Sequence, residues 1–418
     1  GALQLPREPA NLALDLVALG DAFVVVVVGG MGSIPGAFLA ALIIAEIKAL
    51  CIALGQVPIA GFEISFTKLT LVVEFLVMAA VLIWRPWGLL GRPAPTVRNP
   101  AETDAPLKRM PSALGVVLAL LVAALIAVPW FEGRFPYAMV LLIDMMIAVL
   151  FAASLHFIMG PGGMHSFGHA AYFGLGAYGA GLFLSAAGLP MSAAMVLAAL
   201  VAGLGAVLFG WFAVRLSGVY LAMLTLALGQ IVWSVVFQWD DFTGGSNGLI
   251  GIWPAEWAGE RRVFYWLTLA VTVLGVAVLW RILQAPFGYA MRAVRDSALR
   301  AEAIGIDTHR AQWLGFIVAG AVAGVAGGLF AFSKGSISPE IIAVGRSIDG
   351  LVMVLLGGVQ ALTGPIVGAS LFVWLEDTFA RETDYWRAML GGVILLLVLL
   401  FPGGIVGSLK RRLAGERA

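Results

Sequence analysis

Long apolar runs separated by short polar stretches dominate the pattern of this chain. A helix needs roughly 17–25 apolar residues to cross about 30 Å of hydrocarbon. Runs of this kind occur at 34–54, 66–84, 112–130, 136–159, 166–188, 191–214, 218–238, 263–282, 311–332, 363–380 and 387–402. Two shorter runs, 17–29 and 346–358, are expected to cross as broken or tilted pieces. Their uneven spacing favours a packed helical bundle, because barrel strands would alternate with period two over about ten residues.

Composition supports the same conclusion. Of the 418 residues, 61% are hydrophobic and only 12% are charged, which is unlike a soluble domain. The formal net charge of +1 gives no indication of a nucleic-acid partner. Cys51 is the only cysteine, so the chain has no intramolecular disulfide and no thiolate metal site. We predict an all-α, polytopic membrane protein with short or broken helices, surrounded by the lipid bilayer.

Clusters of Lys and Arg predict the orientation, since cytoplasmic loops retain basic residues. The clusters lie at 85–111, 281–310 and 410–417. Six predicted spans separate the first cluster from the second, which places both on the same side. A cytoplasmic C-terminus then requires the short run 346–358 to cross as well. The stretch 281–310 is therefore expected to be a charged cytoplasmic loop.

An internal repeat indicates how the chain is organised. The segment that begins at Asp21 resembles the segment that begins at Asp349, and 349 − 21 gives an offset of 328. The same offset relates Gly30 to Gly358 and Gly36 to Gly364. We predict that residues 1–91 are the C-terminal part of one permease unit, 92–111 a cytoplasmic linker rich in proline and charge, and 112–418 a complete second unit.

Several motifs resemble the branched-chain amino acid permeases of the ABC transporter superfamily, LivH-like over 1–91 and LivM-like over 112–418. They are GPGGMHSFGHA from Gly160, SGVYLAMLTLALGQ from Ser217, TGGSNGL from Thr243, and the charged loop with the glycines that follow it. The first unit departs from the family because it lacks the N-terminal half. The chain begins at Gly1, so we expect either that this half precedes it or that a second permease chain supplies it.

The resemblance implies a permease in the bacterial inner membrane that receives its solute from a periplasmic binding protein. Two cytoplasmic ATPase subunits would hydrolyse ATP, and this chain has no G-x-x-x-x-G-K-[ST] pattern of its own. The ATPase-coupling residues implied by the resemblance are Arg295, Arg300, Ala301, Glu302, Ala303 and Gly305. The residues from Met291 to Ala303 favour one helix, which Gly305 can end in a left-handed conformation. The alternative is an ordinary solvated loop helix.

Polar residues within the apolar runs are candidates for the substrate pathway, because such groups normally face protein or water. The candidates are Ser166, His169, Thr225 and Gln230, and the alternative for each is a structural hydrogen bond. His165 and His169 are four residues apart and could share a helix face, but no third ligand lies near them, so we predict no metal site. Gly320, Gly324 and Gly328 form a small-residue seam that allows close helix packing.

The sequence therefore predicts the membrane subunit of an ATP-driven importer for branched-chain amino acids, with no catalytic residues and no bound cofactor. A related permease for urea or short amides is an alternative. A second alternative is an ion-gradient-driven carrier or channel, which Asp144, Glu46 and Glu376 within or near the apolar runs would suit. A structural scaffold or an enzyme has less support, because polar motifs interrupt the spans and no nucleophile lies near a base.

Overall fold

The predicted spans form helices in the computed structural model. It describes residues 14–59, 62–92, 112–131, 133, 137–360 and 363–413. The chain divides into two units, Gly1–Arg98 and Asn99–Ala418. The predicted linker lies outside the described residues except for its first position, Arg92.

The described part of the first unit contains three helices and a hairpin. These are α1 (Leu14–Gly29), α2 (Ile34–Leu54), β1 (Gln56–Ile59), β2 (Phe62–Ser65) and α3 (Phe66–Trp84). Ser33 caps α2 by accepting the N–H of Gly36 at 3.1 Å, and Pro35 lies in its first turn. The strands are antiparallel, with Gln56 opposite Ser65. The apolar pattern does not predict this hairpin, which follows Gly55 at a φ of +59°.

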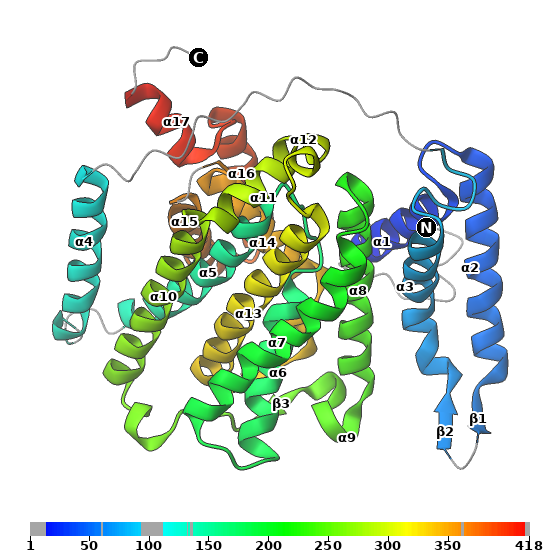
Figure 1. The fold of residues 1–418 in the computed structure, drawn as a ribbon. Helices are drawn as coiled ribbons and strands as arrows, with labels where there is room; N and C mark the ends of the chain where they lie inside the picture. The colour runs from blue at the N-terminus through cyan, green and yellow to red at the C-terminus, as the bar shows by residue number, and fades with distance from the viewer. Residues whose placement is uncertain are drawn as a thin grey trace. The chain divides into compact units, whose positions relative to one another are not determined.

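The second unit is a helical bundle with short helices and two-residue strands between its longer helices (Figure 1). Its elements are α4 (Ser112–Ala127), η1 (Val128–Phe131), α5 (Ala138–Met159), α6 (Ala170–Ser185), α7 (Met191–Ala213), α8 (Gly218–Gln238), α9 (Asp240–Thr243), η2 (Gly245–Asn247), β3 (Leu249–Ile250), η3 (Glu256–Ala258), α10 (Arg261–Leu283), α11 (Pro286–Asp296), α12 (Ala298–Ala303), α13 (Thr308–Lys334), β4 (Ser336–Ile337), η4 (Pro339–Ile342), α14 (Val344–Gly357), α15 (Gly364–Glu382), α16 (Trp386–Leu400) and α17 (Gly404–Leu413). β3 and β4 pair antiparallel.

Seven helical segments of the described chain are long and apolar enough to cross a membrane. They are α2, α5, α7, α8, α10, α13 and the segment Trp386–Leu409. The other predicted spans form helices of 14 to 19 residues, namely α1, α3, α4, α6, α14 and α15. The predicted all-α, polytopic fold is confirmed.

One span is shorter than predicted. The sequence predicts a helix over 166–188, but α6 begins only at Ala170 and ends at Ser185. Gly163 has a φ of +67°, and the chain up to Gly168 stays irregular. A Cβ on Gly168 would collide with the carbonyl of Thr225 in α8. The prediction failed here because close contact with α8 holds this segment in an irregular path.

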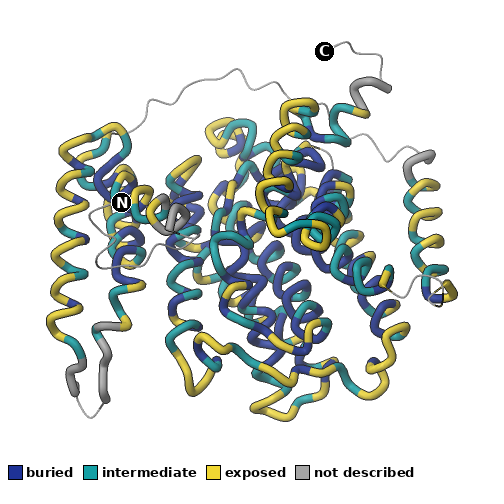
Figure 2. Tube along the Cα trace, turned by 180° about the vertical axis from the view of Figure 1, so that it is seen from behind, coloured by how far each residue is buried: buried dark blue, intermediate teal, exposed yellow. Residues whose placement is uncertain are grey.

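The core of the second unit lies around α5. Every residue from Met146 to Met159 is buried, and Figure 2 shows the buried residues concentrated in the central helices. α13 packs against α5, α6 and α7. Helices that contact protein on all sides must find partners for their polar groups within the bundle.

The glycine seam of α13 faces α7. A Cβ on Gly320 would collide with the Cβ of Ala206, and one on Gly324 would collide with the Cβ of Ala202. A Cβ on Gly328 would lie 2.9 Å from the sulfur of Met195. Small residues on both helices therefore let α13 approach α7 closely.

The two copies of the internal repeat have the same local backbone geometry. Gly30 has a φ of +102° and Gly358 a φ of +114°, each just after a helix end. Gly30 packs against the backbone of Gly88, and Gly358 packs against that of Gly404. Only glycine tolerates such close backbone approach together with a positive φ. The sequence repeat is thus also a structural repeat.

The seam predicts opposite effects for two Gly→Ala substitutions. Gly324→Ala should destabilise the protein by about 1–3 kcal/mol, because the added methyl group overpacks the contact with α7. Gly391→Ala should be neutral or stabilising, because that helical glycine has open space around its Cβ position. Thermal unfolding of both variants in one detergent measures the difference. Equal melting temperatures of the two variants would contradict close packing of α13 against α7 at Gly324.

Candidate functional site

The charged loop between α10 and α13 folds into two helices, α11 and α12. The prediction of one continuous helix from Met291 to Ala303 is wrong. Ser297 interrupts it with extended backbone, at a φ of −166° and a ψ of 104°. Its hydroxyl accepts the N–H of Arg300 at 3.4 Å and so caps α12. Serine prefers such a capping position to a helix interior, because its side chain competes for backbone hydrogen bonds.

Gly305 ends α12 in the left-handed region that the sequence predicts, with a φ of +87°. The N–H of Gly305 donates to the carbonyl of Glu302 at 2.9 Å. The N–H of Ile306 donates to the carbonyl of Ala301 at 3.0 Å. This pair of hydrogen bonds is the Schellman arrangement, which satisfies the last carbonyl groups of a helix.

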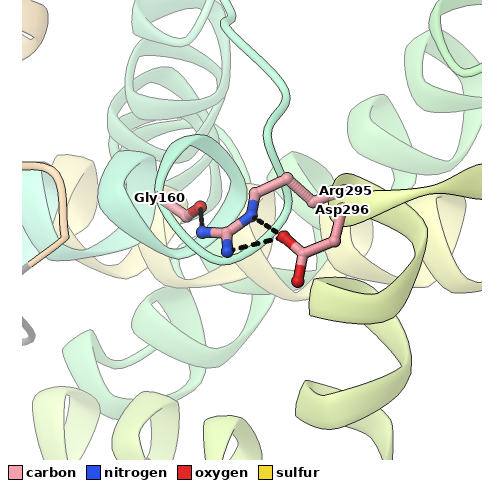
Figure 3. A network of polar contacts seen from close by, with 3 residues as sticks. All are labelled: Gly160, Arg295 and Asp296. Carbon is pink, nitrogen blue, oxygen red and sulfur yellow. Dashed lines mark hydrogen bonds and ion pairs between the residues drawn. The ribbon is translucent and has the colours of Figure 1, made fainter. Parts of the chain in front are cut away.

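Arg295 points into the bundle. Figure 3 shows its guanidinium between Asp296 and the C-terminal end of α5. Nη1 donates to the carbonyl of Gly160 at 3.0 Å, while Nε and Nη2 donate to Asp296 at 2.9 and 2.8 Å. The aliphatic part of Arg295 lies against Gly163. Arg295 therefore ties the loop to the core.

The end of α5 also contacts the break between α14 and α15. His156 Nε2 lies 2.7 Å from the carbonyl of Val359, and a Cβ on Gly160 would collide with the same oxygen. The N–H of Gly160 donates to the carbonyl of His156 at 2.8 Å. The turn after α5 is thus in contact with the loop through Arg295 and with the helix break through His156.

α12 is joined to α13 by a second polar contact. Thr308 Oγ1, in the first turn of α13, donates to Glu302 at 2.9 Å. Ala301 is buried and packs with Val294 and Ala311. Asp307 caps α13 by accepting the N–H of Arg310 at 3.0 Å. Ala301 is therefore packed inside the loop, while the exposed Glu302 connects α12 to α13.

The outer surface of the loop is apolar in part, which the sequence reasoning missed. Leu299 is 80% exposed and Ile304 is 75% exposed. Arg300 and Ala303 are exposed beside them. We call these four residues the loop face. Two large aliphatic residues on the solvent side of a short helix are the signal that could have revealed it.

Three of the four predicted pathway residues, Ser166, His169 and Thr225, are buried around the irregular segment before α6. His169 Nε2 lies 2.9 Å from the hydroxyl of Ser154 in α5. Thr225 Oγ1 accepts the N–H of Phe167 at 3.1 Å and donates to the carbonyl of Ala222 at 2.8 Å. The hydroxyl of Ser166 and Nδ1 of His169 are buried without a hydrogen-bond partner. Thr225 thus has a structural hydrogen bond, while Ser166 and His169 keep unused polar atoms.

The remaining polar residues are more dispersed. Gln230 is half-buried further along α8. His165 is exposed and does not share a helix face with His169, because the segment between them is irregular. Asp144 forms an ion pair of 2.9 Å with Lys334, a partner that the sequence pattern does not predict. Within the described ranges, no group of three His, Cys, Asp or Glu side chains could hold a metal ion.

Comparison with known proteins gives consistent matches in the second unit. Residues 137–399 match the family described as the branched-chain amino acid transport system / permease component. The high-affinity branched-chain amino acid transport system permease protein LivM of Escherichia coli K12 is 29% identical over 295 aligned residues, covering 64% of this chain and 69% of the relative. LivM of Salmonella typhimurium is 28% identical over 295 residues, again covering 64% of this chain and 69% of the relative.

A more distant relative is the autoinducer 2 import system permease protein LsrC of Escherichia coli O9:H4. It is 28% identical over 160 residues, covering 36% of this chain and 46% of the relative. No solved structure matches the chain significantly.

The contact of Arg295 with Gly160 predicts a local effect on backbone opening. Arg295→Gln should accelerate amide hydrogen exchange in α11 about tenfold, because a hydrogen bond from a charged group contributes roughly 1.5–3 kcal/mol. Arg292→Gln, on the same helix, serves as the matched control and should leave the rate near that of the wild type. Hydrogen exchange of peptides covering 286–296, measured by mass spectrometry, gives the rate for each variant. Equal rates in the two variants would contradict a stabilising contact between Arg295 and Gly160.

Proposed function

The chain belongs to the family of branched-chain amino acid transport system permease components, and from this premise we propose that it moves branched-chain amino acids across the bacterial inner membrane. It is a multi-pass permease of the ABC importer class. The observation that carries the substrate proposal is the family match over residues 137–399. The chain would receive the solute from a periplasmic binding protein, and partner ATPases would supply the energy.

The loop face is the proposed docking site for a cytoplasmic ATPase subunit. Its exposed Leu299 and Ile304 lie among charged residues, which suits insertion into a cleft of a partner protein. Arg295 and Glu302 would couple this surface to the bundle, because they tie the loop to α5 and α13. ATP-driven closure of the ATPase subunits would then shift α5 and α13 together. This shift would change the side of the membrane to which the substrate pathway opens. Ser166, His169, Thr225 and Gln230 are the proposed pathway residues.

The first unit is proposed to be the C-terminal part of a LivH-like permease, joined to a LivM-like unit by a cytoplasmic linker. The shared geometry around Gly30 and Gly358 supports this proposal. A complete importer would need two ATPase subunits and two docking loops, and the second loop would come from a second permease unit. With the docking loop in the cytoplasm, the C-terminus would also be cytoplasmic. Figure 1 supports this placement, since α12 and α17 lie toward the same end of the bundle.

ATP dependence tests the proposed function. We expect proteoliposomes that hold the chain with its cognate permease and ATPase subunits to import leucine when ATP and the binding protein are present. A variant ATPase that cannot hydrolyse ATP should abolish this uptake. Dissipating the proton gradient at fixed ATP should have little effect. The ion pair Asp144–Lys334 favours a gradient-driven carrier as the second candidate, and uptake that follows the proton gradient and ignores ATP would establish that carrier instead.

The loop face predicts where ATPase binding can be disrupted. Leu299→Asp and Ile304→Asp should each weaken co-purification of the ATPase about tenfold or more, because a buried charge would replace an apolar contact. His309→Asp, which alters an exposed position in the first turn of α13, is the matched control and should retain the ATPase. Pull-down at graded salt concentrations measures the affinities. Normal binding by both loop-face variants would contradict the docking site.

A further inference from the structure

Arg346 is an unusual charge in the interior of the second unit. It lies in the first turn of α14, and its guanidinium carbon is 5.4 Å from the ring centre of Phe173, 5.8 Å from Phe330 and 6.0 Å from Phe151. These rings also pack on one another, at 5.1 Å for Phe151 with Phe173 and 5.5 Å for Phe173 with Phe330. Cation–π attraction holds the arginine in place. Nε of Arg346 is nevertheless buried with no hydrogen-bond partner.

Two carboxylates accompany this arginine. Asp349 lies one turn further along α14, and Glu376 lies on α15. Glu376 interacts electrostatically with both Asp349 and Arg346. All three charged residues are half-buried, so none is sealed within the core. Charges at such depth are unfavourable unless they bind a partner or water.

The first copy of the internal repeat carries charged residues at the positions equivalent to Asp349 and Glu376, and there the charges are paired. At the repeat offset of 328, Asp21 corresponds to Asp349 and Lys48 corresponds to Glu376. Lys48 forms an ion pair with Glu74 of α3, and Asp21 also contacts that carboxylate. Arg346 corresponds to Ala18, so the first copy has no equivalent arginine. The second copy therefore carries an extra cation that lacks the direct ion pair found in the first.

The start of α14 offers polar atoms for a ligand, with open space beside Gly345. α14 begins inside the bundle, since Ile341 and Ile342 just before it are buried and Ser347 accepts the N–H of Ala170 at 3.0 Å. A Cβ on Gly345 would meet no atom within 4 Å. The ring of Phe151 also contacts His169, whose Nδ1 lacks a partner.

We propose that Arg346, Asp349 and Glu376 bind the zwitterionic head of an aliphatic α-amino acid during transport. The guanidinium of Arg346 binds the carboxylate, and Asp349 with Glu376 binds the ammonium group. The half-buried ring of Phe330 provides an apolar wall for the side chain, while the fully buried rings of Phe151 and Phe173 hold Arg346 from behind. This inference rests on the proposed function, and it assigns the recognition of the solute to α14 and α15.

Direct binding of leucine tests this site separately from transport. The chain, assembled with its partner permease and ATPases in nanodiscs, is titrated with radiolabelled leucine without ATP or binding protein. We expect saturable binding that Arg346→Gln weakens about tenfold or more. Arg346→Lys should restore part of the affinity, because it keeps the charge but not the planar fork. Arg215→Gln is the matched control, since Arg215 also lies over an aromatic ring, Trp211, but is exposed.

Two leucine analogues identify the roles of the charges. 4-Methylpentanoate lacks the ammonium group and 3-methylbutylamine lacks the carboxylate, so each should compete poorly with leucine in the wild type. Glu376→Gln should reduce the difference in binding affinity between leucine and 4-methylpentanoate. A purely structural role of Glu376 would not produce this effect. If the Arg346→Gln variant does not assemble with its partner subunits, the leucine affinities of Arg346→Lys and Glu376→Gln test the site instead.

Two results would overturn the site. One is the absence of saturable leucine binding by the wild type, and the other is unchanged affinity and selectivity in the Arg346 and Glu376 variants. ATP-driven leucine uptake by the same wild-type complex would still support the importer. The two proposals can therefore fail separately.

Discussion

Close contact between backbones at glycine is the constraint on which the second unit depends. Gly320, Gly324 and Gly328 let α13 approach α7 so closely that Ala206, Ala202 and Met195 of α7 occupy the space of their absent side chains. Gly358 allows α14 to end inside the bundle, where its backbone meets that of Gly404. A helix can end within a membrane protein only if its backbone is shielded from lipid. The small residues thus provide both the tight core and the broken helix beside the charged residues of α14.

The loop between α10 and α13 depends on this core. Arg295 donates to the end of α5, and Glu302 accepts from the first turn of α13. Arg295 and Glu302 are therefore both engaged by the bundle, while Leu299 and Ile304 remain exposed on the surface of the loop. This arrangement suits a docking element, because a rigid connection transmits displacement better than a flexible tether does. The turn after α5 adds a contact with the break between α14 and α15.

The interior charges give the two repeat copies different chemistry on a similar backbone. In the first copy, Lys48 and Glu74 pair with each other. In the second, Arg346 rests on three aromatic rings beside Asp349 and Glu376. A duplicated scaffold can thus keep its helix breaks, which backbone geometry demands, while its charged positions diverge. The break geometry is structural, whereas the charges at α14 and α15 are where solute selection is proposed to reside.

The apolar runs by themselves determined the helical membrane fold, because the length of a span and the cost of burying polar backbone leave few alternatives. The constant offset between Gly30 and Gly358 likewise determined the repeat. Tertiary structure decided the rest. Contact with α8 shortened α6, capping by Ser297 divided the loop helix, and long-range contacts turned Arg295 inward and left Leu299 exposed. Periodicity reports which residues are apolar, but the partner of a polar side chain depends on helices hundreds of residues away.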